Sequence, residues 1–446
     1  MLRSLFCGSI MMPAVFSHLL SAEARGEENP LAPKAPHFPA KAKRVIFIYL
    51  PGGVSHVDSF DYKPRLIDDA KNGRLYEGRR TLLTPMWEFK PRGKSGIMTS
   101  ELFPNIGESI DDICVINSMR GDHNDHFQAT MGIHSGSVTF KRPSLGSWVS
   151  YGLGTENQNL PSFVVLAPQL PYAGGQVWDS DFLPGVHQGT RVVAGDEPVA
   201  NLKRRAPSPQ IQEAELSLLE RFNRRHQQPR ASDPQLAARI KTYETAFGMQ
   251  REMPEVLDLS KETDATLNLY GLKRGQTTGF GWQCLVARRM AERGVRFIEL
   301  IDVGASNNWD AHGDMKTHEP LARNIDKPIA GLIKDLKSRG MFDDTLVVWT
   351  TEFGRSPTAE GSYGRGHFCF AYSSLLAGAG VRGGMAYGKT DDFGMKVVEN
   401  EVHVHDFHAT ILHLLGFDHT KLTFRHGGRD FRLTDVSGKV VKAILA

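Results

Sequence analysis

The sequence predicts an α/β fold, a doubly wound and mostly parallel sheet flanked by helices. Short apolar runs rich in β-branched residues recur along the chain, and such runs suit strands that are buried on both faces. Segments with helical spacing lie between these runs, and this alternation is typical of parallel sheets joined by crossover helices. Ionisable residues directly follow several of the runs, which indicates polar loops at one edge of the sheet.

Composition narrows the class of protein further. The chain has 446 residues, of which 40% are hydrophobic and 23% charged, as is ordinary for a soluble globular protein. Its formal net charge is only +3, so no basic field indicates a nucleic-acid partner. The sequence contains neither a repeat of fixed period nor a low-complexity tract. We therefore expect one large α/β core with insertions and no nucleic-acid binding.

Residues 1–24 have the pattern of an export signal. Arg3 supplies a positive start, residues 5–20 are mostly apolar, and Ala22-Glu23-Ala24 forms an A-x-A cleavage site. A retained membrane anchor is the alternative, although the apolar run is short for a membrane span. No later segment approaches the length of a spanning helix. We expect an exported protein, periplasmic or extracellular.

The four cysteines do not form a disulfide framework in this interpretation. Cys7 would leave with the signal, and Cys114 and Cys284 lie in apolar runs. Together with Cys369 they are too few and too apolar in context for a stapled fold, so buried free thiols are expected.

The rest of the chain divides into a linker and one long domain. Residues 25–43 hold four prolines and several lysines, which predicts an extended linker without packed structure. Residues 44–446 form the α/β domain, with an insertion or cap at about 167–278, where loops give way to a charged helical segment. Tyr172, Trp178 and Phe182 in this insertion could line a substrate entrance or simply pack.

The elements of the domain follow in a regular order. Buried strands are predicted at 44–50, 113–116, 162–166, 295–301, 345–350 and 371–376. Helices are predicted at 127–134, 143–152, 281–294, 319–340 and 405–412. Asp125 or Asn124 is the expected N-cap of the first helix, and Asp406 that of the last. The segment between Glu352 and His367 is predicted to be a turn-rich loop, because glycines punctuate it.

Metal-ligand side chains follow three of the predicted strands. These side chains are His56 and Asp58 after the first strand, Asp310 and His312 after 295–301, and Glu352 and His367 after 345–350. The carboxyl ends of strands are where open α/β sheets bind ligands. Mixed Asp, Glu and His from several loops suits a hydrolytic site with one or two divalent ions. Zn, Ca, Mg and Mn all remain possible identities.

A fourth strand end carries the densest polar cluster of the chain. Arg120, Asp122, His123 and His126 lie within seven residues, just before the helix predicted at 127–134. A helix N-terminus offers free N–H groups and a positive dipole end, which suits an anion such as phosphate or sulfate. The alternative is a capped helix with polar surface residues and no further role.

Seven ordered motifs resemble a known family. They are RVIFIYLPGGVSHVDSFDYKP, HFQATMGIHSG with PSLGSWVSYGLG, NNWDAH, TEFGR, GRGHF, HDFHATILHLLG and GGRDFRLTD, and they extend over about residues 31–445. They resemble domain of unknown function 1501 (DUF1501), an exported bacterial family of sulfatase-like members of the alkaline phosphatase superfamily. The resemblance suggests the twin-arginine export route. Only Arg3 is present, however, so the general secretory route or a misassigned start codon stays open.

The resemblance also assigns roles to the strand-end residues. The superfamily's first metal-binding Asp resembles Asp58, with His56 beside it. Its middle Asp and His resemble Asp310 and His312, at a shorter spacing. Its late Asp-His pair falls on Glu352 and Phe353, so one imidazole is missing. His367 resembles the last His ligand or replaces the lost one.

The position of the superfamily's nucleophile departs most from the pattern. Sulfatases place a Cys-derived formylglycine, Ser or Thr nine residues before a Thr-Gly pair; Ser135-Gly136 resembles that pair, and the residue nine positions earlier is His126. His126 could form a covalent intermediate, ligate a metal or act as general base. We assign it, with His123 and Arg120 at the anion, to catalysis.

Two functions of different classes follow from these observations. The first is an exported, metal-dependent hydrolase of sulfate or phosphate esters, with a sulfated polysaccharide among the candidate substrates. The second is a catalytically degenerate member that binds a sulfated glycan or a protein partner without turnover, which the missing hydroxyl at position 126 favours. A metal-dependent enzyme of another reaction class is a further alternative.

Overall fold

The computed structural model describes residues 29–200, 202–230 and 234–446. The predicted export signal and Cys7 lie outside the described residues. Within them, Cys114, Cys284 and Cys369 are buried and free, as their sequence context predicts. A search of the same residues finds no helix long and apolar enough to cross a membrane.

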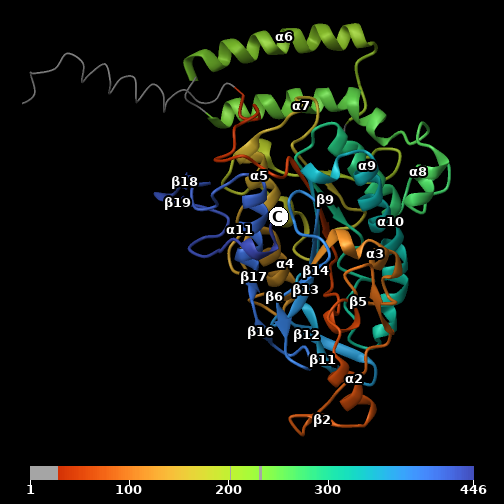
Figure 1. Cartoon of the computed structure of the whole chain (residues 1–446). Coiled ribbons are helices and arrows are strands. Elements are labelled where there is room, and N and C mark those ends of the chain that lie inside the picture. Colours follow the sequence, from red (N-terminus) through yellow and green to blue (C-terminus); the bar gives the residue numbers. More distant parts are fainter. Residues whose placement is uncertain (1–28, 201, 231–233) are drawn as a thin grey trace, which may run out of the picture.

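A nine-stranded sheet organises the molecule (Figure 1). In spatial order its strands are β14 (Met385–Tyr387), β6 (Ile113–Arg120), β13 (Tyr372–Ala377), β10 (Thr345–Thr350), β1 (Arg44–Tyr49), β9 (Phe297–Ile301), β7 (Phe163–Leu166) and β8 (Thr190–Val192), with β17 (Val402–His403) beside β6. Within it, β13 is antiparallel to both neighbours, and the other pairs are parallel. This confirms the predicted mostly parallel α/β sheet.

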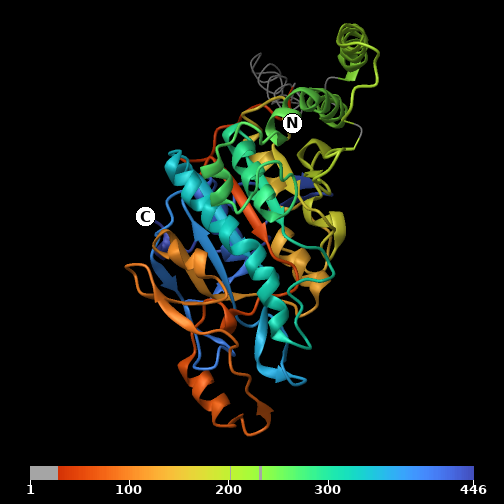
Figure 2. The same ribbon diagram turned by 90° about the vertical axis from the view of Figure 1, so that its right-hand side faces the viewer.

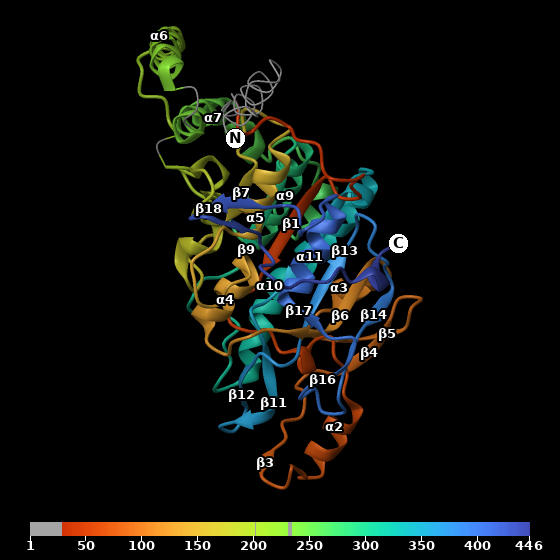
Figure 3. The same ribbon diagram turned by 90° about the vertical axis from the view of Figure 1, so that its left-hand side faces the viewer.

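Helices cover both faces of the sheet. The α-helices of the described residues are α2 (Pro64–Lys71), α3 (Pro104–Glu108), α4 (His126–Ser135), α5 (Leu145–Leu153), α6 (Pro209–Gln227), α7 (Pro234–Leu257), α8 (Asp264–Leu269), α9 (Phe280–Glu292), α10 (His318–Ser338) and α11 (Val404–Leu414), of which α2 and α6 lie away from the sheet. Figure 2 shows α10 crossing one face, where it packs with α3, α8 and α9. Figure 3 shows α4, α5 and α11 together on the other side of the molecule.

Two apolar clusters explain why the strands have nearly continuous apolar sequences. In β1, Ile46 and Ile48 join the cluster that includes α9 and α10, whereas Val45, Phe47 and Tyr49 join the cluster that includes α5 and α11. Successive side chains of a strand point to opposite faces, so a sheet covered on both sides needs apolar residues at every position.

Short two-stranded ribbons complete the molecule and correct one prediction. They are β2 (Leu75–Tyr76) with β3 (Arg80–Thr81), β4 (Phe89–Arg92) with β5 (Ile97–Ser100), β11 (Gly354–Glu360) with β12 (Gly364–Phe368), β15 (Lys389–Thr390) with β16 (Val397–Glu399), and β18 (Phe424–His426) with β19 (Arg429–Phe431). The segment after Glu352, predicted to be a loop, is therefore a β-hairpin. Its glycines hid the alternation that marks strands, and the pairing register contains an irregularity.

The helix α11 begins earlier than predicted. His403 is its N-cap, and Asp406 lies at the third helical position, where its side chain accepts the His403 N–H in a capping box. The sequence suggested Asp406 as the cap because Asp is a common N-cap residue, but a carboxylate three residues later serves the same terminus.

The segments predicted to be a linker and an insertion both contact the domain. In the described part of the linker, Lys34 N–H donates to the Leu153 carbonyl, Phe38 N–H donates to the Gly416 carbonyl, and Leu31 and Ala42 are buried. The prolines of this segment disfavour helix and strand, but the segment still packs against the domain. The range 167–278 supplies the edge strand β8 and the long helices α6 and α7.

Candidate metal centre

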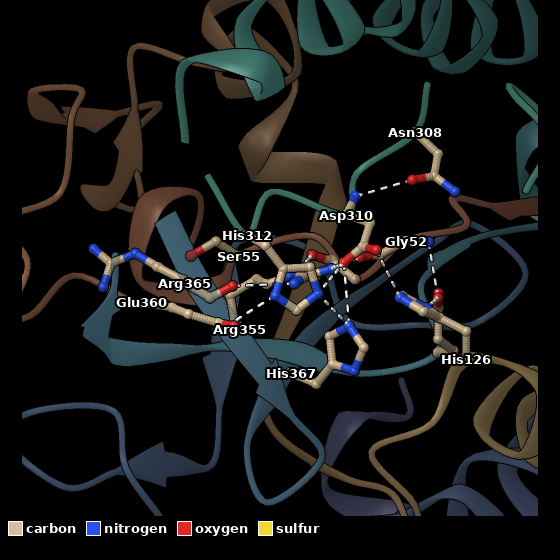
Figure 4. Close-up of polar contacts among 12 residues, drawn as sticks. Gly52, Ser55, His126, Asn308, Asp310, His312, Arg355, Glu360, Arg365 and His367 are labelled. Atoms are coloured by element: carbon tan, nitrogen blue, oxygen red, sulfur yellow. Dashed lines mark hydrogen bonds and ion pairs between the residues drawn. The ribbon is translucent and has the colours of Figure 1, made fainter. Parts of the chain in front are cut away.

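Four parallel strands deliver polar residues to one edge of the sheet. The strands β1, β6, β9 and β10 run in the same direction, so the segments that follow them meet at their carboxyl ends. There the structure brings together His126, Asp310, His312, Glu352 and His367 (Figure 4). These five were singled out in the sequence because each follows a predicted strand or its loop.

Two glycines after β1 make room for this edge. Gly52 and Gly53 have φ of +118° and +84°, a region that other residues rarely adopt. A Cβ on Gly52 would lie 2.6 Å from the Asp310 nitrogen, and one on Gly53 would lie 2.7 Å from the Phe353 ring. The backbone therefore approaches the site more closely than any side chain would permit.

His126 is fixed by the start of α4. Asp125 caps the helix by accepting the Phe127 N–H at 2.9 Å, so His126 is the first helical residue. Its Nδ1 lies 2.7 Å from Glu352 Oε1 and its Nε2 3.2 Å from Asp310 Oδ2. The Tyr172 ring stacks on the imidazole, with ring centroids 4.1 Å apart.

His367 and His312 approach Asp310 from the other side. Both Nε2 atoms contact Asp310 Oδ1, at 3.1 Å from His367 and 2.9 Å from His312. The two Nε2 atoms lie 2.8 Å from each other. His367 Nδ1 lies 2.6 Å from the Asn124 carbonyl, and His312 Nδ1 2.9 Å from Glu360 Oε2.

Asp310 is held as a carboxylate by its neighbours. Burial alone would raise the pKa of Asp310, but the contacts from His126, His367 and the Arg355 guanidinium lower it well below its usual range. Arg355 is fully buried, pairs with Asp310, and donates to the carbonyls of Gly53 and Arg365. Asp310 is therefore an anion at the centre of the cluster.

The electrostatics of His126 depend on what binds its Nε2. Burial alone would lower the pKa of His126, but the carboxylates of Asp310 and Glu352 raise it to about 9. The protein without a bound cation therefore holds a proton on this imidazole at neutral pH. A metal ion would compete with that proton for the same lone pair.

The donor set fits a metal ion. Glu352, Glu360 and the Asn124 carbonyl can only accept hydrogen bonds, so each of the three histidines carries its proton on Nδ1. Once a metal ion displaces any proton from Nε2, every Nε2 offers a lone pair on the side of Asp310. One donor atom each from His126, Asp310 and His367 lie within 4.8 Å of one another, and His126 Nε2 is buried without a hydrogen-bond partner. Three imidazoles with anchored Nδ1 atoms and one carboxylate suit a zinc-like ion.

Glu352, which the sequence suggested as a metal ligand, instead contacts one of the candidate ligands. Its Oε1 accepts from His126 Nδ1 and the Gly52 N–H, and its Oε2 accepts from the hydroxyls of Tyr49 and Thr351. With both oxygens occupied and the side chain fully buried, Glu352 orients His126. Conversely His126, expected to be a reactive group, lies among the candidate ligands.

His56 and Asp58, to which the superfamily resemblance gave a ligand role, do not join the cluster. Asp58 forms a buried ion pair with Arg365 at 2.7 Å and accepts hydrogen bonds from the Ser55 hydroxyl and the Met86 N–H. His56 is fully buried, and its Nε2 contacts the Gly394 carbonyl at 2.9 Å. A short 3-10 turn after β1 directs both side chains inward, so Arg365 neutralises the carboxylate.

Arg120 and His123, expected at the anion, also have other partners. Arg120 pairs with Glu401 at 3.2 Å on the surface, and His123 Nδ1 accepts the Asp125 N–H at 3.0 Å. Of the three aromatic residues named for a substrate entrance, Tyr172 reaches the cluster. Trp178 is buried in the core, and Phe182 stacks on Phe424.

The site residues missed in the sequence are those that support the ligands. Arg355, Glu360 and the Asn124 carbonyl each contact a candidate ligand, and no spacing rule identifies them. The signal available was Arg355 itself, since an Arg next to a predicted buried strand end requires a carboxylate partner.

The cluster is open to solvent on one side. Side-chain exposure rises from 11% for His126 through 23% for His367 and 25% for Asp310 to 41% for His312. A molecule from solvent therefore reaches the cluster beside His312, while the Tyr172 and Phe353 rings pack against His126.

The chain belongs to a defined protein family. Residues 42–445 match the family described as "Protein of unknown function (DUF1501)", in agreement with the resemblance carried by the seven motifs. No curated protein matches the chain. The class of the molecule is thus an α/β protein of this family with a polar cluster at the carboxyl ends of its strands.

Several solved structures have distant similarity to this chain. Ps i-CgsB in complex with k-i-k-neocarrahexaose matches with a TM-score of 0.39 and 11% identity over 84% of this chain and 72% of that one. The PsFucS1 sulfatase from Pseudoalteromonas sp. matches with 0.35 and 11%, over 92% and 72%. Alkaline phosphatase from the Antarctic bacterium TAB5 matches with 0.33 and 8%, over 78% and 94%. Likeness at this distance carries no conclusion about activity.

Proposed function

We propose that the protein is a metal-dependent hydrolase of sulfate or phosphate esters, with its ion at the cluster of His126, Asp310, His312 and His367. The observation that carries the proposal is the state of the three imidazoles. Each Nδ1 is tied to an acceptor, and each Nε2 is aimed at the Asp310 carboxylate. The Nε2 atoms of His312 and His367 lie 2.8 Å apart, a contact that a shared proton or a bound cation satisfies.

The side chains of the cluster would have distinct tasks. His126, His312, His367 and Asp310 would hold the ion, and Glu352, Glu360 and the Asn124 carbonyl would fix the three rings. A bound divalent ion neutralises the charge of an ester oxyanion and makes a bound water acidic. Arg355, buried behind Asp310, keeps that carboxylate ionised and oriented.

Water is the proposed nucleophile. The residue at the superfamily's nucleophile position is His126, and both of its nitrogens already have neighbours in the cluster. None of the described residues that contact the four candidate ligands through a hydrogen bond or ion pair is a Ser, Thr or Cys. A formylglycine mechanism therefore has no support in this chain.

The second candidate is a protein that binds a sulfated glycan or another anion without turnover. The same absence of a hydroxyl nucleophile favours it, as does Phe353, which occupies the position of the missing imidazole and is fully buried. Metal binding is common to both candidates, so only turnover separates them.

Metal content tests the shared part of the proposal. Wild-type protein purified after exposure to Zn, Mn, Ca or Mg should retain about one ion per chain, measured by inductively coupled plasma mass spectrometry. His126→Ala and His367→Ala should lose it. His123→Ala is the matched control, because it removes a nearby imidazole outside the cluster and should leave the metal content unchanged. A wild-type protein that binds none of the four ions would refute the site.

Turnover then separates hydrolase from binding protein. The loaded enzyme should hydrolyse p-nitrophenyl phosphate or p-nitrophenyl sulfate, and Asp310→Ala should abolish this activity. A loaded protein inert toward both esters across pH 6 to 10, yet retained on a sulfated polysaccharide column, would select the second candidate.

We also propose export, on the pattern of residues 1–24 alone. N-terminal sequencing of protein from the extracytoplasmic fraction should find a start near Arg25, after cleavage near Ala24. Full-length chain confined to the cytosol would refute it.

A further inference from the structure

The hydroxyl of Tyr172 is a hydrogen-bond donor beside the candidate metal centre, and the proposed function leaves it unused. Tyr172 follows β7, which runs parallel to β9, so both strands deliver their loops to the same edge of the sheet. Its ring covers one face of the His126 imidazole, with the two planes 6° apart. Tyr172 is half-buried, and a phenol is un-ionised at neutral pH. The hydroxyl can therefore donate one hydrogen bond.

Asn308 determines which role this hydroxyl takes. The Asp310 N–H donates to Asn308 Oδ1 at 3.1 Å, and Asn308 Nδ2 donates to the Gly304 carbonyl at 3.1 Å. An N–H group can only donate and a carbonyl can only accept, so these two backbone groups fix the orientation of the amide. The second hydrogen of Nδ2 is therefore directed to the Tyr172 oxygen, 3.0 Å away.

Tyr172 is consequently left with a free hydrogen. Its oxygen accepts from Asn308, so its own O–H has to be donated to another group, and no described residue accepts it. Asn308 also joins this hydroxyl to the backbone of Asp310, the carboxylate at the centre of the cluster (Figure 4). The free hydrogen therefore belongs to the surroundings of the candidate metal centre.

The backbone beside both residues of this pair has an uncommon conformation. Ala173, next to Tyr172, has φ of +64°, and Asn307, next to Asn308, has φ of +51°. The left-handed region is unfavourable for a residue with a Cβ, although Asn tolerates it better than Ala. Conformational cost of this kind persists where the surrounding structure holds a segment in one arrangement. The fold thus fixes the positions of Tyr172 and Asn308.

The arginines of this edge are already engaged. Arginine is the common partner of a sulfate or phosphate group, because its N–H donors match the oxygens of the anion. Arg355 and Arg365 are, however, fully buried in ion pairs with carboxylates. Arg120 pairs with Glu401 on the surface. A neutral donor is therefore the group that remains for an anion bound at the cluster.

We propose that Tyr172 donates its hydroxyl hydrogen bond to a non-bridging oxygen of the sulfate or phosphate group that binds at the metal centre. This role rests on the proposed function and adds to it a residue that contacts the substrate. No proton is transferred, because the phenol keeps its hydrogen and the anion accepts it. Asn308 is then a positioning residue, since its amide occupies the Tyr172 oxygen and leaves the hydrogen for the anion.

Anion binding to the metal-loaded protein tests the role of the hydroxyl. Tyr172→Phe keeps the ring on His126 and removes only the hydroxyl, so its metal content and circular dichroism should equal those of the wild type. Its affinity for inorganic phosphate or sulfate, measured by isothermal titration calorimetry, should fall about 10- to 100-fold. Whichever of the two anions the wild type binds identifies the class of ester. Tyr243→Phe is the matched control, because it removes an exposed hydroxyl on α7 and should bind as the wild type does.

Tyr172→Ala separates the hydroxyl from the ring. This variant removes both, and its anion affinity should be as low as that of Tyr172→Phe. An alanine variant that loses affinity while the phenylalanine variant keeps it would show that the ring acts through His126, and would overturn the proposal.

Failure of this role and failure of the hydrolase proposal give different results. Equal anion affinity in wild type and Tyr172→Phe, or loss of metal from Tyr172→Phe, overturns the role of the hydroxyl and leaves the hydrolase proposal standing. A wild type that binds neither anion overturns the role as well. A loaded wild type whose anion affinity depends on the Tyr172 hydroxyl, but which hydrolyses neither p-nitrophenyl ester, supports the role and refutes the hydrolase. With an active enzyme, kcat/KM should fall in Tyr172→Phe by about the same factor as the anion affinity.

Discussion

At the scale of the residue, the cluster is defined by the outer partners of its histidines. Each Nδ1 is held by a carboxylate or carbonyl oxygen, which leaves each Nε2 free to bind. Such partners fix both the tautomer and the orientation of a ligand ring, and they raise its basicity. The candidate centre is therefore determined by hydrogen bonds as much as by the ligands.

The partner of His312 gives the first prediction. Glu360 is half exposed and contacts His312 Nδ1, so Glu360→Ala should leave the fold intact while releasing that ring. We expect metal affinity to fall by roughly 10- to 100-fold, measured by competition with a chromophoric chelator. Glu401→Ala removes a carboxylate of similar exposure that pairs with Arg120, and it should have no effect. Equal affinities in all three proteins would show that Glu360 is not part of the site.

Asp58 gives a prediction that separates this chain from the superfamily pattern that its motifs resemble. The fully buried pair of Asp58 and Arg365 would leave an unpaired guanidinium in Asp58→Asn, which should lower the free energy of unfolding by about 3–5 kcal/mol. Metal content per folded chain should not change. Urea denaturation and metal analysis of one preparation measure both quantities. Loss of metal at unchanged stability would restore Asp58 as a ligand.

At the scale of the element, the turn after β1 and the hairpin β11–β12 hold the site together. Arg355 and Arg365, from the two strands of the hairpin, pair with Asp310 and Asp58. Arg355 also donates to the Gly53 carbonyl, at 3.0 Å. The hairpin thus connects the loops that follow β1 and β9 through buried ion pairs.

The close approach at Gly53 is a third prediction. In Gly53→Ala a Cβ would lie 2.7 Å from the Phe353 ring, on a backbone with φ of +84°. Strain and overpacking together should lower the free energy of unfolding by at least about 2 kcal/mol and loosen metal binding. Gly185→Ala is the control, because nothing lies within 4 Å of the added methyl group. Equal denaturation midpoints for the two variants would contradict the packing argument.

At the scale of the whole molecule, three buried histidines make stability depend on pH. Burial is the main cause that lowers the pKa of His187, His318 and His408 to about 3. Between about pH 6.5 and 3 the unfolded chain binds protons that the folded chain does not, so stability falls as the pH falls through this window. Above about pH 7 these groups are neutral in both states and contribute no pH dependence.

The fourth prediction follows from this proton difference. Each of the three histidines should lower stability by about 2 kcal/mol between pH 7 and 5, in metal-free protein with a chelator present. Urea denaturation at the two pH values measures the loss, and His187→Gln should reduce it by about the contribution of one group. A free energy of unfolding that is equal at pH 7 and pH 5 would contradict the buried neutral state.

Sequence alone determined the strand and helix order of the core, the family, and the edge of the sheet where polar groups gather. Those properties depend on local periodicity and on the rule that parallel strands end at one edge, so β1 and β10 were predicted nearly to their bounds.

Tertiary structure decided which of the polar groups converge. Asp58 and Asp310 both follow buried strands, but whether a carboxylate faces histidines or a buried arginine depends on the hairpin that supplies Arg355 and Arg365 from more than forty residues away in sequence. Ion pairs between distant segments leave no periodic pattern in a sequence. For that reason the sequence could name candidate ligands of this centre, but it could not distinguish them from nearby polar residues that have other partners.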